Sequence, residues 1–113
     1  MTSTQEALQK IIAEHSVVLF MKGTPEMPMC GFSSVAAEIL RRSGVAFQDV
    51  DVLKSQDIRE GIKAFSDWPT IPQLYIKGEF VGGCDILKEM YQSGELRSFL
   101  KEKGIAFEDA APS

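Results

Sequence analysis

The feature that most constrains the fold of this chain is a run of five apolar residues, Val17-Val18-Leu19-Phe20-Met21. These residues favour β-structure and do not alternate with polar ones, which is typical of a strand buried on both faces of a sheet. Such a strand requires helices on both sides of its sheet. A chain of 113 residues, 44% of them hydrophobic, is long enough for one core of this kind and too short for two. The sequence therefore predicts a single α/β domain.

Helix and strand patterns alternate along the rest of the chain. Apolar residues at helical spacing follow a capping box at Ser3–Glu6, and Gly and Pro residues interrupt the chain between positions 22 and 29. A loop therefore delivers Cys30 to the start of a second helix. The expected elements are a helix over about 4–14, a strand over 17–21, a helix from Cys30 to near Gly44, a strand over 47–52, a helix from Ser55 to Trp68, a hairpin around Lys77–Glu79, a helix from Asp85 to Gly94 and a helical stretch around 96–100.

The order α-β-α-β-α-β-β-α-α combines a parallel βαβ unit with a terminal hairpin. This order requires a mixed four-stranded sheet with helices on both faces, which is the thioredoxin-like arrangement. We expect the domain to occupy residues 1–107 and a flexible, polar tail to occupy residues 108–113. No repeat or linker divides the chain.

Composition narrows the classes of function. The 16 acidic and 12 basic residues give a formal charge of −4, and no cluster of Lys and Arg marks a nucleic-acid surface. No run approaches the roughly 18 apolar residues that span a bilayer, and the amino terminus is polar. We therefore expect no nucleic-acid or membrane partner, and a soluble protein that is not exported.

The two cysteines, Cys30 and Cys84, lie far apart in the sequence, which fits neither a disulfide framework nor a zinc-binding spacing. A reducing compartment is the expected environment. The single histidine, His15, has no partner at metal-ligand spacing, so a metal bound here would need ligands from outside the chain.

Cys30 is the first candidate for chemistry, because it lies at the start of a helix that follows a buried strand. Backbone N–H groups at that helix end stabilise a thiolate and lower the thiol pKa from about 8.5, and Lys22 adds a cation. The alternative is a small buried packing residue. Ser33, three residues on, excludes a C-x-x-C disulfide, so the site must borrow its second thiol. Its hydroxyl either donates to the thiolate or is an ordinary serine near a helix start.

Three other segments carry candidate residues. A proline at the start of a strand, Pro72, suggests a cis Ile71-Pro72 bond, although the frequency of cis bonds alone favours trans. In Gly82-Gly83-Cys84-Asp85, Asp85 is either a ligand-binding carboxylate or an N-cap. Cys84 is interpreted as a small packing residue, and a second redox thiol is the alternative. Arg59 is, by default, a solvated charge.

Four elements occur in order along the chain: Lys22, Cys30-Gly31-Phe32-Ser33, Trp68-Pro69-Thr70-Ile71-Pro72 and Gly82-Gly83-Cys84-Asp85. Together they resemble the CGFS monothiol glutaredoxins, and the resemblance extends from about residue 4 to residue 104. The C-x-x-S element alone occurs by chance. The WPT-x-P and GGCD elements at these separations are specific to this family.

The resemblance implies a glutathione pocket and a 2Fe-2S cluster that two subunits share through one cysteine each and two glutathione thiols. It also implies a role for each matching residue: Cys30 as cluster ligand and potential nucleophile, Lys22 and Arg59 facing the glycine carboxylate of glutathione, Ile71 pairing its backbone with the cysteinyl part, and Cys84 and Asp85 holding the γ-glutamyl end. A cis bond before Pro72 is implied as well.

The function implied in this way is an iron–sulfur carrier that is a homodimer when cluster-bound and passes the cluster to apo-proteins, with a BolA-like protein as a further partner. The alternative is a glutathione-dependent thiol-disulfide oxidoreductase acting through Cys30. The long loop Gly23–Met29 and Ser33 favour the carrier, with at most weak oxidoreductase activity. A third interpretation, a redox-inert scaffold, requires a buried Cys30 with an unshifted pKa.

The resemblance also bears on location, because short members of the family are cytoplasmic in bacteria and organellar in eukaryotes. The absence of an Arg-rich leader favours the cytoplasm, and a processed organellar form is the alternative. Met27 and Met29 are unusual residues beside the active cysteine, and the sequence assigns them no role.

Overall fold

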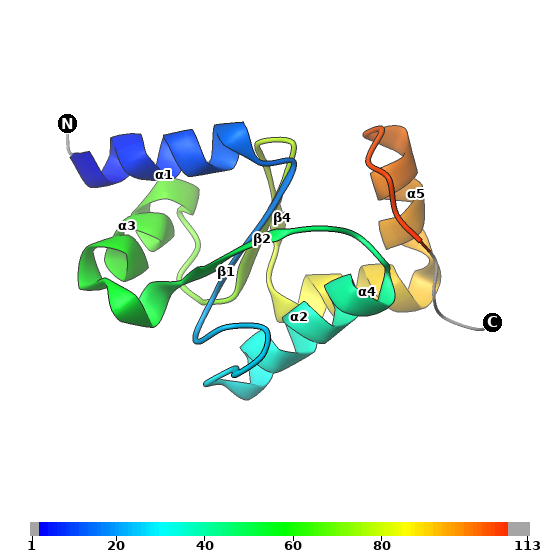
Figure 1. Ribbon diagram of the computed structural model, residues 1–113, viewed down its shortest axis with the longest axis horizontal. Helices are drawn as coiled ribbons and strands as arrows, with labels where there is room; N and C mark the ends of the chain where they lie inside the picture. Colours follow the sequence, from blue (N-terminus) through cyan, green and yellow to red (C-terminus); the bar gives the residue numbers. More distant parts are fainter. Residues whose placement is uncertain (1–2, 109–113) are drawn as a thin grey trace.

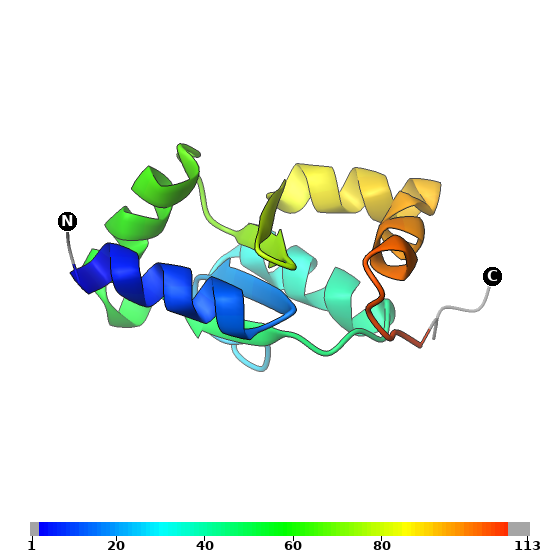
Figure 2. The same cartoon turned by 90° about the horizontal axis from the view of Figure 1, so that it is seen from above.

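A mixed four-stranded sheet separates two groups of helices in the computed structural model, which describes residues 3–108 (Figure 1). The helices α1 and α3 lie on one side of the sheet, and α2, α4 and α5 lie on the other, in both views (Figures 1 and 2). The elements are α1 (Ser3–Glu14), β1 (Val17–Met21), α2 (Gly31–Arg42), β2 (Gln48–Asp51), the 3-10 helix η1 (Val52–Lys54), α3 (Gln56–Ser66), β3 (Gln73–Ile76), β4 (Glu79–Gly82), α4 (Cys84–Ser93) and α5 (Glu95–Glu102).

The strands lie in the order β2-β1-β3-β4. β1 pairs in parallel with β2 and antiparallel with β3, and β4 completes the sheet as the second strand of a hairpin. This topology confirms the predicted thioredoxin-like fold, with its βαβ unit followed by a hairpin. It also places the start of α2, and with it the candidate cysteine, at the carboxyl end of the central strand β1.

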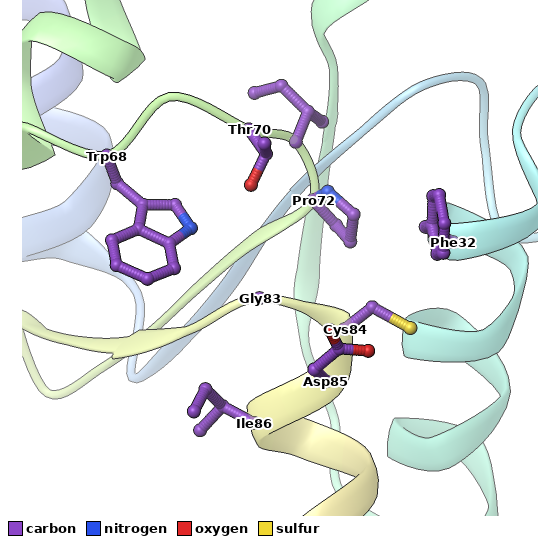
Figure 3. A pocket seen from close by; sticks show the side chains of 9 residues that line it. Phe32, Trp68, Thr70, Pro72, Gly83, Cys84, Asp85 and Ile86 are labelled. Carbon is purple, nitrogen blue, oxygen red and sulfur yellow. The ribbon is translucent and has the colours of Figure 1, made fainter.

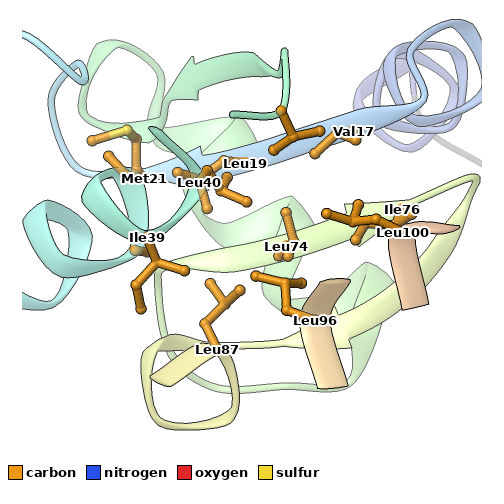
Figure 4. Packing of buried hydrophobic residues seen from close by; sticks show 13 residues of the cluster. Val17, Leu19, Met21, Ile39, Leu40, Leu74, Ile76, Leu87, Leu96 and Leu100 are labelled. Carbon is orange, nitrogen blue, oxygen red and sulfur yellow. The ribbon is translucent and has the colours of Figure 1, made fainter. Parts of the chain in front are cut away.

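β1 is buried along its whole length, as its composition predicted. Alternate side chains of a strand point to opposite faces of the sheet, so each face receives its own share of the run. Val17, Leu19 and Met21 pack with residues of α2, α4 and α5 (Figure 4), whereas Val18 and Phe20 pack with residues of α1 and α3. The central strand thus joins two hydrophobic cores.

Three details differ from the sequence prediction. β2 is shorter than 47–52 and runs into η1, a turn that was missed; the carboxylate of Asp51 accepts the Leu53 N–H at 2.9 Å there. The predicted N-cap role of Asp85 is wrong, because α4 begins at Cys84 with Gly83 as its N-cap. Phe32 begins the helical spacing of apolar residues in α2, continued by Val35 and Ala36, and this spacing predicts a buried side chain. It is instead 64% exposed, since it lies in the first turn of that helix and lines a surface hollow.

The predicted tail over 108–113 lies mostly outside the described residues. Glu108, its first residue, is described, and its N–H donates to the Gly44 carbonyl at 3.1 Å. Between residues 3 and 108, no helix has both the length and the apolar stretch needed to cross a bilayer.

Candidate functional site

Cys30 is the N-cap of α2 and follows the loop that leaves β1. Its backbone is extended, and its carbonyl accepts the Ser34 N–H at 2.9 Å, which begins the helix. The thiol is half-buried and forms no disulfide. This exposure makes the packing-residue interpretation of Cys30 wrong.

The surroundings of Cys30 lower the pKa of its thiol. The main cause is the backbone N–H of Ser33, which stabilises the thiolate, and the Phe32 N–H, the charge of Lys22 and the Ser33 hydroxyl act in the same direction. Partial burial of the sulfur opposes them and is outweighed. The N–H groups lie in the first turn of α2, where no side chain caps them. The conditions for a redox-inert scaffold are therefore not met.

Ser33 links the start of α2 to the end of β1. Its side chain is fully buried, and its hydroxyl oxygen accepts the Lys22 N–H at 2.9 Å. Because a hydroxyl group both accepts and donates, the same group supports the Cys30 thiolate. The two interpretations of Ser33 from the sequence therefore hold together: Ser33 lies in the first turn of α2, and its hydroxyl also lowers the pKa of the Cys30 thiol.

The loop between β1 and α2 is held by its own backbone. Thr24 and Met27 exchange N–H to carbonyl hydrogen bonds of 3.2 and 3.0 Å, and the Met29 N–H donates to the Lys22 carbonyl at 2.9 Å. The Gly23 N–H donates to the carboxylate of Asp51 at 2.9 Å, which fixes the loop to the end of β2. Cys30 therefore follows a closed loop whose two methionines, Met27 and Met29, are 70% and 63% exposed.

A hollow of about 190 Å³ lies beside Phe32, in the first turn of α2 (Figure 3). One wall is the segment before β3, and the other is the first turn of α4 with the glycine that precedes it. The peptide bond Ile71-Pro72 in the first wall is cis, as the resemblance implied. The two walls lie so close together that a Cβ added to Gly83 would be 3.1 Å from the Pro72 carbonyl oxygen. The lining residues are Phe32, Trp68, Thr70, Ile71, Pro72, Gly83, Cys84, Asp85 and Ile86.

The structure brings most of the predicted site residues to this region. Ile71, Cys84 and Asp85 line the hollow; Cys30 does not line it but lies two residues from Phe32, which does. Lys22 acts on the thiol through its charge. Cys84 is buried, as expected of a packing residue, and burial is the main cause that raises the pKa of its thiol.

Arg59 stands apart from the hollow. It lies on α3, is only partly exposed, and its Nε is buried without a hydrogen-bond partner among the described residues. Its default interpretation as a solvated surface charge is therefore wrong for that atom. A buried, unpaired N–H is costly, which favours a ligand or water partner for Nε.

Two residues that shape the site were missed by the sequence analysis. Asp51 fixes the loop before Cys30, and Gln73, a fully buried polar residue, donates hydrogen bonds to the carbonyls of Trp68 and Thr70. The only sequence signals were a carboxylate at a strand end and a polar residue in an otherwise apolar strand, and neither identifies its partner.

The arrangement supports a specific kind of ligand. α4 has a glycine as its N-cap and no side chain that satisfies its first N–H groups, and its first turn lines the hollow. Such a helix start binds a carboxylate, and the exposed Asp85 beside it provides a partner for an amine. Between residues 3 and 108, no group of three His, Cys, Asp or Glu side chains lies together to hold a metal. The site therefore suits a ligand that carries a carboxylate and an amine at one end, as an amino acid does.

Comparisons with known proteins agree with this geometry. The Glutaredoxin family model matches residues 17–81. The probable monothiol glutaredoxin 2 of Rickettsia typhi is 58% identical over 96 residues, which cover 85% of this chain and 86% of that protein. A monomeric truncated mutant of Trypanosoma brucei 1-C-Grx1, solved in solution, has a TM-score of 0.86 and 43% identity, covering 93% of this chain and 96% of that one. A buckwheat glutaredoxin–glutathione complex, 24% identical with a TM-score of 0.78 over 90% of this chain and 91% of that one, shares the fold.

Proposed function

The chain belongs to the monothiol branch of the glutaredoxin family, and on that premise we propose that it binds glutathione beside Cys30 and carries a 2Fe-2S cluster between two subunits to apo-proteins. The observation that supports this proposal most is the state of Cys30. Its thiol is accessible and has a lowered pKa, and Ser33 stands where a dithiol site has its second cysteine. The protein thus offers one thiolate, and a second thiol comes from a ligand.

In this proposal, the γ-glutamyl and cysteinyl parts of glutathione lie in the hollow. The α-carboxylate of the γ-glutamyl group matches the first-turn N–H groups of Cys84 and Asp85, and its α-amine matches the Asp85 carboxylate. The backbone of Ile71 lies along the wall where the cysteinyl part would extend. Lys22 and Arg59, which do not line the hollow, are the proposed partners of the glycine carboxylate.

The cluster is the cargo of this site. Iron–sulfur clusters prefer thiolate ligands, and Cys30 supplies one from each subunit. Two glutathione thiols complete the set of four, so half of the ligands are diffusible, which favours release to a recipient. The exposed apolar side chains of Met27, Met29 and Phe32 lie within three residues of Cys30 in the sequence and suit contact with a second subunit. A BolA-like protein and apo iron–sulfur proteins are the proposed partners.

A second function, glutathione-dependent reduction of mixed disulfides, uses the same residue. The Cys30 thiolate attacks the glutathione sulfur of a glutathionylated protein and forms a Cys30–glutathione disulfide. The mixed disulfide of the substrate breaks, and the substrate protein leaves as a thiolate that takes up a proton. A free glutathione thiolate then attacks the Cys30–glutathione disulfide and releases glutathione disulfide. The buried Cys84, whose pKa is raised, is a poor resolving thiol, which favours this route over an internal disulfide.

The proposed location is the cytoplasm. Both cysteines are free thiols, and an accessible thiol of lowered pKa persists in a reducing compartment. A processed form in a reducing organelle is the alternative.

Anaerobic reconstitution with iron, sulfide and glutathione tests the carrier function. We expect a coloured species that elutes as a dimer, bleaches when glutathione is removed, and does not form with Cys30→Ser. The control Cys84→Ser keeps the colour, because only the backbone of that residue is assigned to the ligand. A colourless monomer that still reduces a glutathionylated peptide through Cys30 would reject the carrier function and support the oxidoreductase.

A further inference from the structure

Gln73 is a polar residue in a place that apolar residues usually occupy. It begins β3 directly after the cis proline, and its side chain is fully buried. A buried amide is retained at low free energy only when its donors and acceptors have partners. The partners of Gln73 therefore show what the residue does.

All of these partners connect one wall of the hollow to the core. The Gln73 Nε2 group donates to the Trp68 carbonyl and to the Thr70 carbonyl, both at 3.2 Å. The Tyr75 hydroxyl donates to the Gln73 Oε1 atom, also at 3.2 Å. Because carbonyl oxygens only accept, this arrangement requires the amide to present its nitrogen to the wall and its oxygen to Tyr75. The orientation of the amide is thus defined at both ends.

The other end of the network is fixed in the core. Tyr75 is buried and contacts the rings of Phe20, Phe65 and Phe80, with centroid distances of 5.7, 6.1 and 5.4 Å. The Trp68 ring packs on Phe80 at 5.7 Å. A rigid aromatic group therefore holds the hydroxyl that orients the Gln73 amide.

The wall itself has few supports of its own. Trp68, Thr70 and Ile71 precede β3 and lie outside any helix or strand. All three line the hollow, and Figure 3 shows Trp68 and Thr70 there. The Trp68 N–H is held from the α3 side, by the Lys63 carbonyl and the Ser66 hydroxyl, each at 3.1 Å. On the β3 side, the Trp68 and Thr70 carbonyls are held by Gln73 alone among the described residues.

We propose that Gln73, oriented by Tyr75, is a positioning residue that sets the Trp68–Ile71 wall at the distance required by the cysteinyl part of glutathione. This inference rests on the proposed function, because it takes glutathione as the ligand of the hollow. Residues that orient metal ligands through hydrogen bonds change affinity by about 10–100-fold when they are lost, and we expect an effect at the lower end of that range for a residue that orients a ligand wall. Gln73 does not act on the thiol, because the groups that lower the Cys30 pKa lie on α2 and at the end of β1.

The test compares Gln73→Met, which keeps the length of the side chain and removes its hydrogen bonds, with Tyr75→Phe. The control Ile76→Val alters the same strand on the side that faces the other core. Glutathione affinity is measured by calorimetry, the state of Cys30 by the pH profile of its alkylation, and stability by thermal unfolding. Trp68 is the only tryptophan, so its emission and its quenching by acrylamide report the wall without any ligand.

We expect Gln73→Met to weaken glutathione binding by about tenfold or more and Tyr75→Phe to weaken it less. Trp68 should become more accessible to acrylamide in both variants, and the Cys30 alkylation profile should not move. The control should lose stability without any change in affinity or quenching.

Unchanged affinity in Gln73→Met would overturn the inference and leave the proposed function intact. If the unmodified protein fails to bind glutathione, the proposed function is rejected. In that case, acrylamide quenching of Trp68 that is the same in Gln73→Met and in the unmodified protein would overturn the positioning role as well. If Gln73→Met does not fold, Tyr75→Phe decides by the same readouts.

Discussion

Gly23 gives the most quantitative test of the loop that positions Cys30. Its φ is +90°, a conformation that side chains other than glycine rarely adopt. A Cβ at this position would lie 2.5 Å from the Met27 carbonyl oxygen, 2.7 Å from the Met29 nitrogen and 2.9 Å from the Met29 Cγ. Two of these atoms belong to the backbone of the loop and cannot move without opening it.

The expected loss of stability in Gly23→Ala has two parts. The positive φ contributes about 1–2 kcal/mol, and the steric overlap contributes about 1–3 kcal/mol, as for other overpacked sites. The control Gly78→Ala isolates the first part, because Gly78 has a φ of +81° and no atom within 4 Å of its added Cβ. We therefore expect losses of about 2–5 kcal/mol for Gly23→Ala and about 1–2 kcal/mol for the control.

Urea unfolding gives both free energies, and alkylation of Cys30 as a function of pH gives the consequence for the site. Relief of the overlap should break the hydrogen bond between Met29 and Lys22 and move the thiol away from the groups that lower its pKa. The alkylation profile of Gly23→Ala should then shift to higher pH, while that of Gly78→Ala stays in place. Equal losses of stability in the two variants would refute this account of the loop.

Three further predictions concern the thiol and its supports. Lys22→Gln should shift the alkylation profile of Cys30 to higher pH, since it removes a charge that lowers the pKa, and an unmoved profile would contradict that role. Asp51→Leu should lower the free energy of unfolding by about 1–3 kcal/mol in urea, because the N–H groups of Gly23 and Leu53 lose their acceptor. Because folding lowers the Cys30 pKa, the thiolate adds stability that is complete above the unfolded pKa of about 8.5 and is lost as the pH falls through the folded value. The difference in unfolding free energy between the unmodified protein and Cys30→Ser should therefore grow as the pH rises towards 8.5, and a constant difference would contradict the lowered pKa.

The order and type of the elements were predictable from local patterns. The uninterrupted run at Val17–Met21 predicted the central strand, and its burial confirms that reading. The third helix was expected to begin at Ser55, and the Ser55 hydroxyl caps it by accepting the Ile58 N–H at 3.3 Å. The turn at Lys77-Gly78 predicted the hairpin, and both residues have positive φ. In each case the signal and the structure lie within a few residues of each other.

The site was only partly predictable, because its supports come from distant parts of the chain. The contact between Asp51 and Gly23 spans 28 residues, and no local pattern joins them. The start of α4 at Cys84 depended on Gly83, which caps the helix without a side chain, while the sequence favoured the carboxylate of Asp85. The exposure of Phe32 depended on the hollow that it lines, which two other segments form.

The mass of the reconstituted protein, measured by native mass spectrometry without oxygen, tests the shared cluster site most directly. We expect one species that contains two chains, one 2Fe-2S cluster and two glutathione molecules, and that is absent with Cys30→Ser. A cluster bound to a single chain, or a cluster-bound dimer without glutathione, would contradict the shared site built around Cys30.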